Sequence, residues 1–484
     1  MKLKCDVVLP APFPISQVTW EDSDVQTRYE KSQLPGIDCD DGDTTSKNVL
    51  DSIIFGTDTP TLTSKARKLC YEFKDIISDS LDPKPARVDE PMEIDIEEGA
   101  WFNNPGARTP SRAQSAAKQH EIRKQLQKMI ANRIIQPSQA KAWSQVLLVR
   151  KPDSKWRFCV DFRNLNAITK LTSGHPIPNI KQMLHRLGDQ KAQYYATLDL
   201  TSGYFQAPLA ESARTFTAFI TFMGIFEFLR VPMGVKGAAP YFQQFVAVTV
   251  LAGLMYICTE AYIDDVIVHG KNEDDFISNL RKVFLRFRKY NVKLQPSKMK
   301  IGLTSVEYVG HKIDKEGLHF TREKLDSVLN FQKPTYQAQL KSFLGLCNYF
   351  RDNVKHHSTL VYPLQKMLDN YDRRSKLQWT PETDAAWENI KHAVHSCPKL
   401  FFIDEFSKIH VYTDASDYGI GGYVMQIVDG KEVPIAFISK TLTESQRKWS
   451  TPQKEAFAIY YTLCKMEHLL LDRHFTIHTD HNVE

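Results

Sequence analysis

Short apolar runs alternate with helical patterns through the middle of the chain, between residues 143 and 270. Runs rich in β-branched and aromatic residues are typical of strands, and their mixture with helical pieces predicts an α+β domain. The predicted strands are Gln145–Val149, Trp156–Val160, Tyr194–Leu198, Thr215–Ile220, Ile225–Leu229 and Ala261–Val268. The longest apolar run, Phe245–Cys258, has 14 residues and is too short to cross a bilayer. It predicts a buried helix that leads into a strand.

Helical periodicity dominates the flanking regions. Residues 64–80 and 118–135 repeat apolar side chains at helical spacing, and an amphipathic helix follows with Phe276, Leu280, Val283, Phe284 and Phe287 on one face. Its many Arg and Lys residues fit either a solvated face or a phosphate-contacting one. Further helices are predicted at Thr321–Phe331, Gln337–Asn353, Pro381–Val394 and Lys454–Leu469, with Pro334 and Pro363 between the first three.

Charge is distributed unevenly along the 484 residues. Residues 1–100 carry a net charge of −10 and the remainder +15. A basic body is compatible with a polyanionic partner, although net charge does not define a fold. The apolar share of 42% and the charged share of 25% exclude wholesale disorder.

The eight cysteines form no CxxC pair, so we expect neither a zinc site nor a disulfide framework. The N-terminus is broken by prolines and makes a poor secretory signal. These features predict a soluble protein that is intracellular, cytoplasmic and not secreted, with no membrane association.

Carboxylates cluster in the first β-rich region. Asp199 ends an apolar strand, and the adjacent Asp264 and Asp265 lie between two apolar runs, which predicts a tight β-hairpin. Clustered carboxylates repel one another unless a cation neutralises them, and such hard oxygen ligands suit Mg²⁺. An Asp-Asp pair in a hairpin is also ordinary turn chemistry, so this pattern alone leaves both interpretations open.

The surrounding sequence strengthens the chemical interpretation. Four segments occur in the order and spacing of reverse transcriptase motifs: WRFCVDFR (156–163), TLDLTSGY (197–204), PMGVKG (232–237) and YIDD (262–265). Over about residues 65–484 the chain resembles the Pol polyprotein of gypsy-type (Metaviridae) LTR retrotransposons. The resemblance implies a right-hand polymerase with fingers, palm and thumb, followed by a connection and an RNase H-like α/β domain. It also implies an intracellular setting that includes virus-like particles.

The implied domain boundaries are a poorly ordered acidic leader (1–63), an N-terminal extension (64–142), fingers and palm (143–319), thumb and connection (320–400), and an RNase H-like domain (401–484). Family members usually continue beyond this last strand into a further helix and a fourth acid. Because the sequence stops at Glu484, we expect the RNase H-like domain to be incomplete at its C-terminus, and its activity to be uncertain.

The resemblance assigns the polymerase chemistry to three acids. Asp199, Asp264 and Asp265 would be catalytic and would hold two Mg²⁺ ions, or Mn²⁺, with the Leu200 carbonyl completing one metal shell. Lys151 and Arg157 would hold the dNTP triphosphate, and Tyr204 would lie under the sugar and exclude a 2′-OH. Taken singly, these residues are also compatible with surface cations and a core tyrosine.

Further residues are implied to contact the substrates. Met233 would contact the incoming nucleotide. RNA template and DNA primer would lie against Tyr308, Gly310, Lys341, Gly345 and Tyr349. The segment around Lys341 is equally compatible with an amphipathic helix that packs a core. The chain departs from the family pattern at Pro240, one place late, for which we expect a small shift of the helix start.

A second carboxylate set follows in the RNase H-like region. Asp414 and Asp480 end predicted strands, and Glu455 lies near the start of a helix. The resemblance implies that these three acids bind two metal ions and hydrolyse the RNA strand of an RNA–DNA hybrid. Without that context, each acid is also compatible with helix capping or an exposed surface.

The favoured function is therefore an RNA-directed DNA polymerase with an attached RNase H domain. One alternative is a catalytically decayed or host-adopted retroelement protein that only binds nucleic acid. A group II intron maturase or a telomerase-like enzyme would share fingers and palm, but the RNase H-like segment after the thumb disfavours both. The sequence does not determine the oligomeric state.

Overall fold

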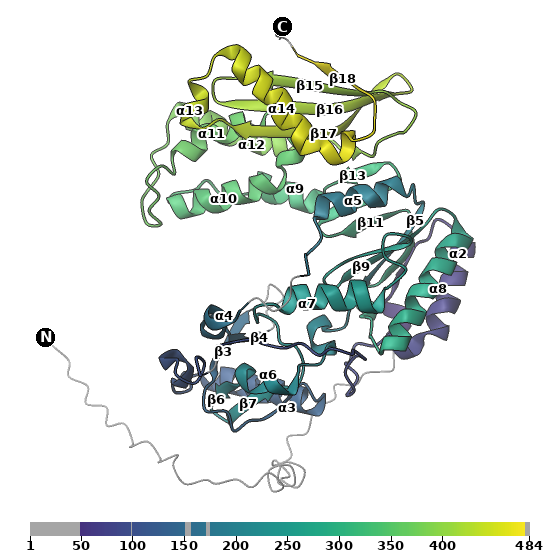
Figure 1. The fold of residues 1–484 in the computed structure, drawn as a ribbon, viewed down its shortest axis with the longest axis vertical. Helices are drawn as coiled ribbons and strands as arrows, with labels where there is room; N and C mark the ends of the chain where they lie inside the picture. Colours follow the sequence, from purple (N-terminus) through teal and green to yellow (C-terminus); the bar gives the residue numbers. More distant parts are fainter. Residues whose placement is uncertain (1–48, 98, 151–155, 171–174, 480–484) are drawn as a thin grey trace, which may run out of the picture. The chain divides into compact units, whose positions relative to one another are not determined.

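The fold was analysed in a computed structural model, which describes residues 49–97, 99–150, 156–170 and 175–479. Four β-sheets and their covering helices make up this part of the chain (Figure 1). The mixture of strands and helices agrees with the predicted α+β class.

The palm sheet has the strand order β1-β10-β5-β9-β8. Its strands are β1 (Ile54–Phe55), β5 (Tyr194–Asp199), β8 (Thr259–Tyr262), β9 (Asp265–Gly270) and β10 (Lys300–Leu303). β8 and β9 form the predicted hairpin and pair antiparallel, as do β9 and β5. The sheet therefore brings the Asp199 motif and the Asp264–Asp265 motif onto neighbouring strands.

Strand alternation divides the palm sheet between two hydrophobic layers. Leu198 of β5 and Val266 of β9 belong to the large core shared with the fingers. Tyr195 and Ile267 lie on the opposite face of the same strands. They belong to a separate core with helix α5 (Ile180–Asp189). Because successive side chains point to opposite faces, both faces of the sheet are buried, which fits the continuous apolar runs of these strands.

The N-terminal extension packs on the palm. Its helix α2 (Pro60–Glu72) lies beside the amphipathic helix α8 (Glu273–Tyr290) (Figure 1). Arg281 forms a bidentate ion pair with Glu72, and Arg288 pairs with Asp75. These two arginines of α8 therefore bind the extension. The sequence had left open a solvated face or a phosphate-contacting face for them, and the structure shows neither for these two side chains.

The fingers sheet has the order β2-β7-β6-β3-β4. Its strands are β2 (Ile135–Pro137), β3 (Ser144–Arg150), β4 (Trp156–Asp161), β6 (Phe219–Thr221) and β7 (Gly224–Phe228). The neighbouring helices are α3 (Ala116–Ala131), α4 (Arg163–Ile168), α6 (Glu211–Arg214) and α7 (Ala238–Gln244). The strand predicted at Thr215–Ile220 is wrong at its start, because Thr215–Thr217 forms a 3₁₀ turn and Thr217 Oγ1 donates to the Arg214 carbonyl.

Helix α7 begins at Ala238 and is followed by a π-helix, Phe245–Val250. Pro240 lies in the first turn of α7, where a missing N–H costs little. The apolar run Phe245–Cys258 is thus a helix that leads through a turn into β8, as predicted.

The region after the palm contains a small sheet, β11-β12-β13-β14, and a helical cluster with its own core. The strands are β11 (Ser305–Tyr308), β12 (His311–Asp314), β13 (Gly317–His319) and β14 (Leu400–Phe401), and the helices are α9 (Arg322–Leu329), α10 (Gln337–Tyr349), α11 (His357–Lys366) and α12 (Pro381–His395). Pro363 lies inside α11 and does not separate two helices, which corrects the sequence expectation.

The last sheet has the order β17-β16-β15-β18, with helix α14 (Thr451–Leu470) packed against β15 and β16 (Figure 1). Its strands are β15 (Ile409–Ala415), β16 (Gly419–Val428), β17 (Lys431–Thr441) and β18 (Phe475–His478), and the short helix α13 (Glu444–Arg447) follows β17. Strand β15 pairs antiparallel with β16 and parallel with β18, so the sheet is mixed.

The assignment of all residues up to 63 to a poorly ordered leader is wrong for its last part. Val49–Ser52 form a 3₁₀ turn, and β1 pairs in parallel with β10 at the edge of the palm sheet. Residues 1–48 of that predicted leader lie outside the described residues. Within the described part of the chain, no helix is both long and apolar enough to span a membrane.

The contact between α2 and α8 provides a test of the fold. Phe284 is fully buried, and its ring centroid lies 5.5 Å from that of Phe73. Phe284→Ala should lower the unfolding free energy of the polymerase region by about 3–5 kcal/mol, because it leaves a cavity. The neighbouring Leu285 is half exposed, and Leu285→Ala should cost far less. Urea unfolding of both full-length variants measures the difference; equal losses would contradict this packing.

Candidate active sites

The register of the palm sheet brings two carboxylates together. Asp199, the last residue of β5, pairs directly with Asp265, the first residue of β9. Residues paired in this way project their side chains from the same face of a sheet, with Cβ atoms about 4.5–5.5 Å apart. Asp199 and Asp265 are therefore neighbours, as the sequence motifs predicted.

Asp264 lies in the two-residue turn between β8 and β9. Ile263 beside it has a positive φ of 58°, which is unusual for a β-branched residue. The buried side chain of Gln243 supports this turn: its Oε1 accepts from the Ile263 N–H at 2.6 Å, and its Nε2 donates to the Ala261 carbonyl at 3.0 Å. This role of Gln243 was not predicted from the sequence, although the residue lies only three positions after Pro240.

The pKa values of Asp199 and Asp265 are raised in this environment. Burial, followed by the charges of Asp264 and Asp199, raises the pKa of Asp265 to about 6. Burial also raises the pKa of Asp199, against the opposing effect of a hydrogen bond from Lys298. The site therefore has an excess of negative charge that a cation would relieve.

The ammonium of Lys298 neutralises part of the negative charge of these carboxylates. Its Nζ lies 3.0 and 2.9 Å from the two carboxylate oxygens of Asp199. The lysine side chain is largely exposed, whereas Asp199 is mostly covered. Sequence analysis missed this residue, and no motif spacing pointed to it.

The donor chemistry of this site fits a divalent cation such as Mg²⁺, because the groups are hard oxygens. Within the described ranges, however, no three His, Cys, Asp or Glu side chains are close enough to hold a metal ion. Leu200, the predicted carbonyl ligand, is buried directly after Asp199 and bridges to Leu294. The acids have the chemical type that a divalent cation prefers, but those in the described residues do not converge on a single ion position, and Lys298 contacts one of them.

The predicted nucleotide-binding residues have different environments. Tyr204 is half-buried and stacks on Phe242 with ring centroids 4.9 Å apart, and burial followed by the Asp264 charge raises its pKa. Met233 and Arg157 are exposed, and no described hydrogen bond or ion pair joins Arg157 to the acids. Lys151 lies outside the described residues. The structure therefore places Tyr204 near the acids, and no described hydrogen bond or ion pair joins Met233 or Arg157 to them.

The predicted primer–template residues divide into buried and accessible positions. Tyr308 is only 2% exposed, and its hydroxyl donates to the Asp265 carbonyl at 3.3 Å, so its side chain supports the start of β9 and has almost no surface to offer a primer. Tyr349 is partly exposed and donates to the Gly310 carbonyl at 3.0 Å. Lys324, missed in the sequence, donates to the same carbonyl.

Two further positions lie on helix α10. The ammonium of Lys341 lies 4.2 Å from the centre of the Tyr371 ring, a cation–π contact that already engages its charge. Gly345 has open space where a Cβ would project. Gly345 is thus the member of this pair whose surface permits close approach of another molecule.

The second candidate site lies in the sheet that carries β15. Asp414 is exposed near the end of β15 and pairs with Gly421 of β16, while Glu455 of α14 is buried and its Oε1 accepts from the Ala415 N–H at 3.0 Å. Asp480 lies outside the described residues.

A cavity of about 650 Å³ adjoins Asp414, and Gly421, Lys355 and His356 line it as well. Lys355 and His356 lie immediately before α11 and were not identified in the sequence, because their positions depend on packing between α11 and β17.

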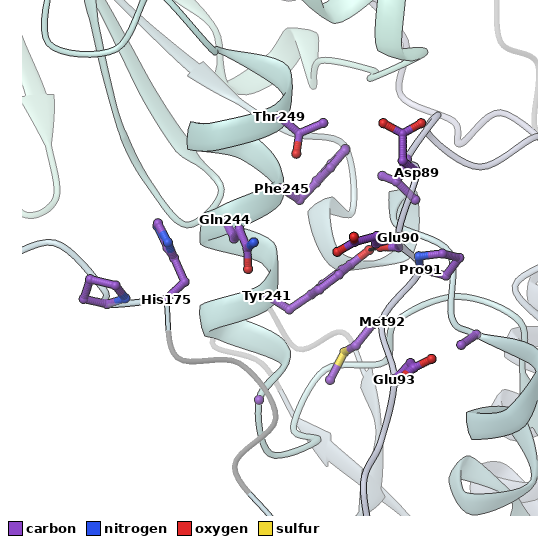
Figure 2. A pocket seen from close by; sticks show the side chains of 14 residues that line it. Asp89, Glu90, Pro91, Met92, Glu93, His175, Tyr241, Gln244, Phe245 and Thr249 are labelled. Atoms are coloured by element: carbon purple, nitrogen blue, oxygen red, sulfur yellow. Dashed lines mark hydrogen bonds between the residues drawn. The ribbon is translucent and has the colours of Figure 1, made fainter.

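A larger cavity of about 1090 Å³ contains none of the predicted site residues. It lies between the strap formed by residues 88–93 and helix α7, where Tyr241 donates to the Glu90 carbonyl at 2.9 Å (Figure 2). Asp89, Glu90 and Glu93 make the strap acidic (Figure 2). The size of a cavity therefore does not locate the carboxylate site in this molecule.

A palm sheet with paired carboxylates at a hairpin, followed by a mixed sheet with its own acids, defines the reverse transcriptase class with an RNase H-like domain. Residues 149–313 match the family "Reverse transcriptase (RNA-dependent DNA polymerase)", and residues 379–477 match "RNase H-like domain found in reverse transcriptase". These two matches, together with the relatives described below, confirm the resemblance to the reverse transcriptase and RNase H region of gypsy-type retrotransposon Pol polyproteins.

Curated relatives include the "Retrovirus-related Pol polyprotein from transposon 412" of Drosophila melanogaster, 30% identical over 86% of this chain and 33% of the relative. The corresponding protein from transposon opus of the same organism is 31% identical over 75% of this chain and 37% of its own length. The "Transposon Tf2-3 polyprotein" of Schizosaccharomyces pombe is 29% identical over 85% of this chain and 30% of its own length. The chain thus spans about a third of the length of these relatives.

Solved structures confirm the fold. The foamy viral protease-reverse transcriptase in complex with RNA/DNA hybrid has a TM-score of 0.75 at 20% identity, over 91% of this chain and 57% of that one. A second structure of that protein, in complex with double-stranded DNA, has a TM-score of 0.74 at 21% identity, over 90% and 74%. The right-hand polymerase fold with an RNase H-like domain, predicted from the motifs, is therefore confirmed.

The raised pKa of Asp265 predicts a pH-dependent stability. Between its ordinary value of 3.8 and about 6, the folded protein holds a proton that the unfolded chain has released, so stability falls as pH rises through this window. Asp265→Asn removes that penalty. Without divalent cations it should stabilise the protein at pH 7.5 by about 1 kcal/mol, after allowance for solvent screening, and have little effect at pH 4.

Urea unfolding at the two pH values measures this difference. Asp314→Asn is the control with the opposite sign: burial opposes the shift, but the Lys399 hydrogen bond and backbone donors hold the pKa of Asp314 below its usual value. This variant should therefore lose stability at pH 7.5. A lower stability of Asp265→Asn at pH 7.5 would contradict the proposed electrostatics.

Proposed function

We propose that the chain is an RNA-directed DNA polymerase that uses two divalent cations for nucleotidyl transfer. The observation that carries the proposal is the cross-strand pair of Asp199 and Asp265, beside Asp264, in an environment that raises the pKa of Asp265 to about 6. Such a group of acids favours a bound cation over three free charges.

Each acid has a defined part in this proposal. Asp199 and Asp264 would be the firmer ligands of the cations, Asp265 would be the supporting carboxylate, and the Leu200 carbonyl would be a further ligand. Bound Mg²⁺ or Mn²⁺ would activate the primer 3′-OH and stabilise charge on the dNTP phosphates. Gly203 allows the turn after Asp199 to approach the hairpin, since a Cβ there would lie 3.1 Å from the Asp264 Cβ.

The remaining residues bind and orient the substrates. Tyr204, stacked on Phe242, forms a flat surface under the sugar and selects against a 2′-OH. Lys151 and Arg157 bind the triphosphate, and Met233 contacts the nucleotide. Tyr349 and Lys324 both donate hydrogen bonds to the Gly310 carbonyl. These bonds connect the helical region to the β11–β12 hairpin, where the primer would lie.

The proposed partners are an RNA template, a DNA primer, the RNA–DNA hybrid and dNTPs. The names of two similar solved structures record complexes of that relative with RNA/DNA hybrid and with double-stranded DNA. The positive net charge of residues 101–484 is compatible with such partners, and binding should weaken as salt rises. We also propose that the protein acts inside the cell, in the cytoplasm or in virus-like particles.

The RNase H-like domain would act on the RNA strand of the hybrid. Asp414 and Glu455 supply its carboxylates together with Asp480, and the cavity beside Asp414 offers room for a phosphate backbone. The Ala415 N–H holds one oxygen of Glu455 and so fixes the direction of its carboxylate.

A decayed protein that binds nucleic acid without chemistry is the competing proposal. The enzyme is favoured because the chain retains the three acids Asp199, Asp264 and Asp265. It also retains the buried Gln243, which holds the turn that carries Asp264. A metal-dependent extension assay on the purified chain separates the two, since the decayed protein would bind hybrid and extend nothing.

Asp264→Asn provides the direct test. Loss of the turn carboxylate should reduce primer extension on an RNA template by at least about a hundredfold, because cation stabilisation of the reacting oxygens would be lost. Asp274→Asn is a matched control, since Asp274 is exposed on α8 and pairs with Lys65. The control should extend at the wild-type rate. Extension by Asp264→Asn at the wild-type rate would show that the catalytic assignment is wrong.

A further inference from the structure

Arg230 is an unusual buried cation in the polymerase region. It lies just after β7, is 2% exposed, and among the described residues its side chain donates hydrogen bonds to backbone carbonyls alone. Five such bonds are present, to Asp82 at 2.7 Å, Pro83 at 2.8 Å, Phe205 at 3.0 Å, Arg133 at 3.1 Å and Asn132 at 3.3 Å. Its guanidinium thus joins three segments that are far apart in the sequence.

No carboxylate in the described part of the chain lies within ion-pairing distance of this guanidinium. The nearby Asp82 carboxylate lies 3.5 Å from the ammonium of Lys293 instead. A buried charge without a counter-ion is costly unless hydrogen bonds compensate for lost water. Burial accordingly lowers the pKa of Arg230. Only a planar fork with several N–H donors can serve so many carbonyls at once, so lysine is a poor substitute.

One of the segments that Arg230 holds is the turn that carries Tyr204. Phe205, whose carbonyl accepts from Nη1, is the next residue in the 3₁₀ turn Gly203–Gln206. The same turn is held at its end by Gln206, whose Nε2 donates to the carbonyls of Thr201 and Lys293. Arg230 therefore ties the Tyr204 turn to the N-terminal extension at Asp82–Pro83 and to the end of α3.

We propose that Arg230 is a positioning residue for sugar selection, which fixes the backbone under Tyr204 and so the height of its ring. This proposal rests on the proposed polymerase function. The segment around Asp82 and Pro83 lies outside the part of the chain that matches the reverse transcriptase family. Under this proposal, it helps to position the nucleotide site through its bonds to Arg230. A ring displaced by even a fraction of an ångström would leave room for a 2′-OH, because steric exclusion depends on close contact.

The experiment uses the full chain and measures kcat/KM for dATP and for ATP on a primed RNA template. Arg230→Met should lower the ratio of dATP to ATP by about 10- to 100-fold, and Arg230→Lys should lie between it and wild type. Tyr204→Ala should remove discrimination outright. Because Arg230 acts through Tyr204, Arg230→Met should reduce the ratio no further in the Tyr204→Ala background.

Gln426→Met is the matched control for lost stability. Gln426 is also buried and also bonds backbone carbonyls, those of Asp404 and Ser407, but it lies in the RNase H-like sheet. It should lower the melting temperature and leave the dATP-to-ATP ratio unchanged.

Each outcome decides the proposal. An unchanged ratio in folded Arg230→Met, or effects of the two substitutions that add, would overturn it. If Arg230→Met does not fold, Arg230→Lys decides by the same ratio, and if neither folds, Arg230 serves folding alone and the positioning role is overturned. Absence of extension by the wild-type chain would instead overturn the proposed function itself.

Discussion

Mutual repulsion of carboxylates is the constraint around which the palm is built. Asp199 and Asp265 face each other across β5 and β9, with Asp264 in the adjoining turn. Such an arrangement is unfavourable by itself, and burial makes it more so. Apolar side chains on both faces of the same two strands hold it in place, since Leu198 and Val266 pack on one side and Tyr195 and Ile267 on the other. Hydrophobic burial thus keeps together groups that electrostatics would separate.

Buried polar side chains complete this support. Gln243 bonds Ala261 and Ile263 where β8 enters the hairpin turn, Gln206 holds the turn after Asp199, and Arg230 joins that turn to the extension. Each of these side chains bonds backbone groups of segments distant in sequence. A buried donor or acceptor that loses its partner is costly, so these contacts specify one arrangement of the loops. Lys298 differs because it is largely exposed and bonds a candidate ligand directly.

Much of the fold was predictable because its signals are local or ordered in sequence. The apolar runs of β5 and β9, the amphipathic pattern of α8, and the motif around Asp264 and Asp265 each indicated the element that the structure contains. The pairing of Asp199 with Asp265 followed from the family resemblance. Periodicity does not define strand register, so it could not have supplied that pairing.

Other features could not be read from local pattern. Lys298 meets Asp199 across 99 positions of sequence, and the pairing of Arg281 with Glu72 spans 209. Tyr308 matched a primer-contacting motif, yet its side chain is buried because its strand packs against α5. Pro363 falls within helix α11, although proline has no N–H to donate and usually ends or kinks a helix, so the local rule predicted its role wrongly.

The most direct test of the central claim is divalent cation binding itself. Isothermal titration of Mn²⁺ into the full chain with a bound primer–template, at pH 7.5 and 5.5, measures affinity and proton release together. If Asp199, Asp264 and Asp265 hold the cation, affinity should fall at the lower pH, since the pKa of Asp265 is raised to about 6. Asp199→Asn should weaken the binding strongly at both pH values. Binding by that variant at wild-type affinity, without dependence on pH, would contradict the account.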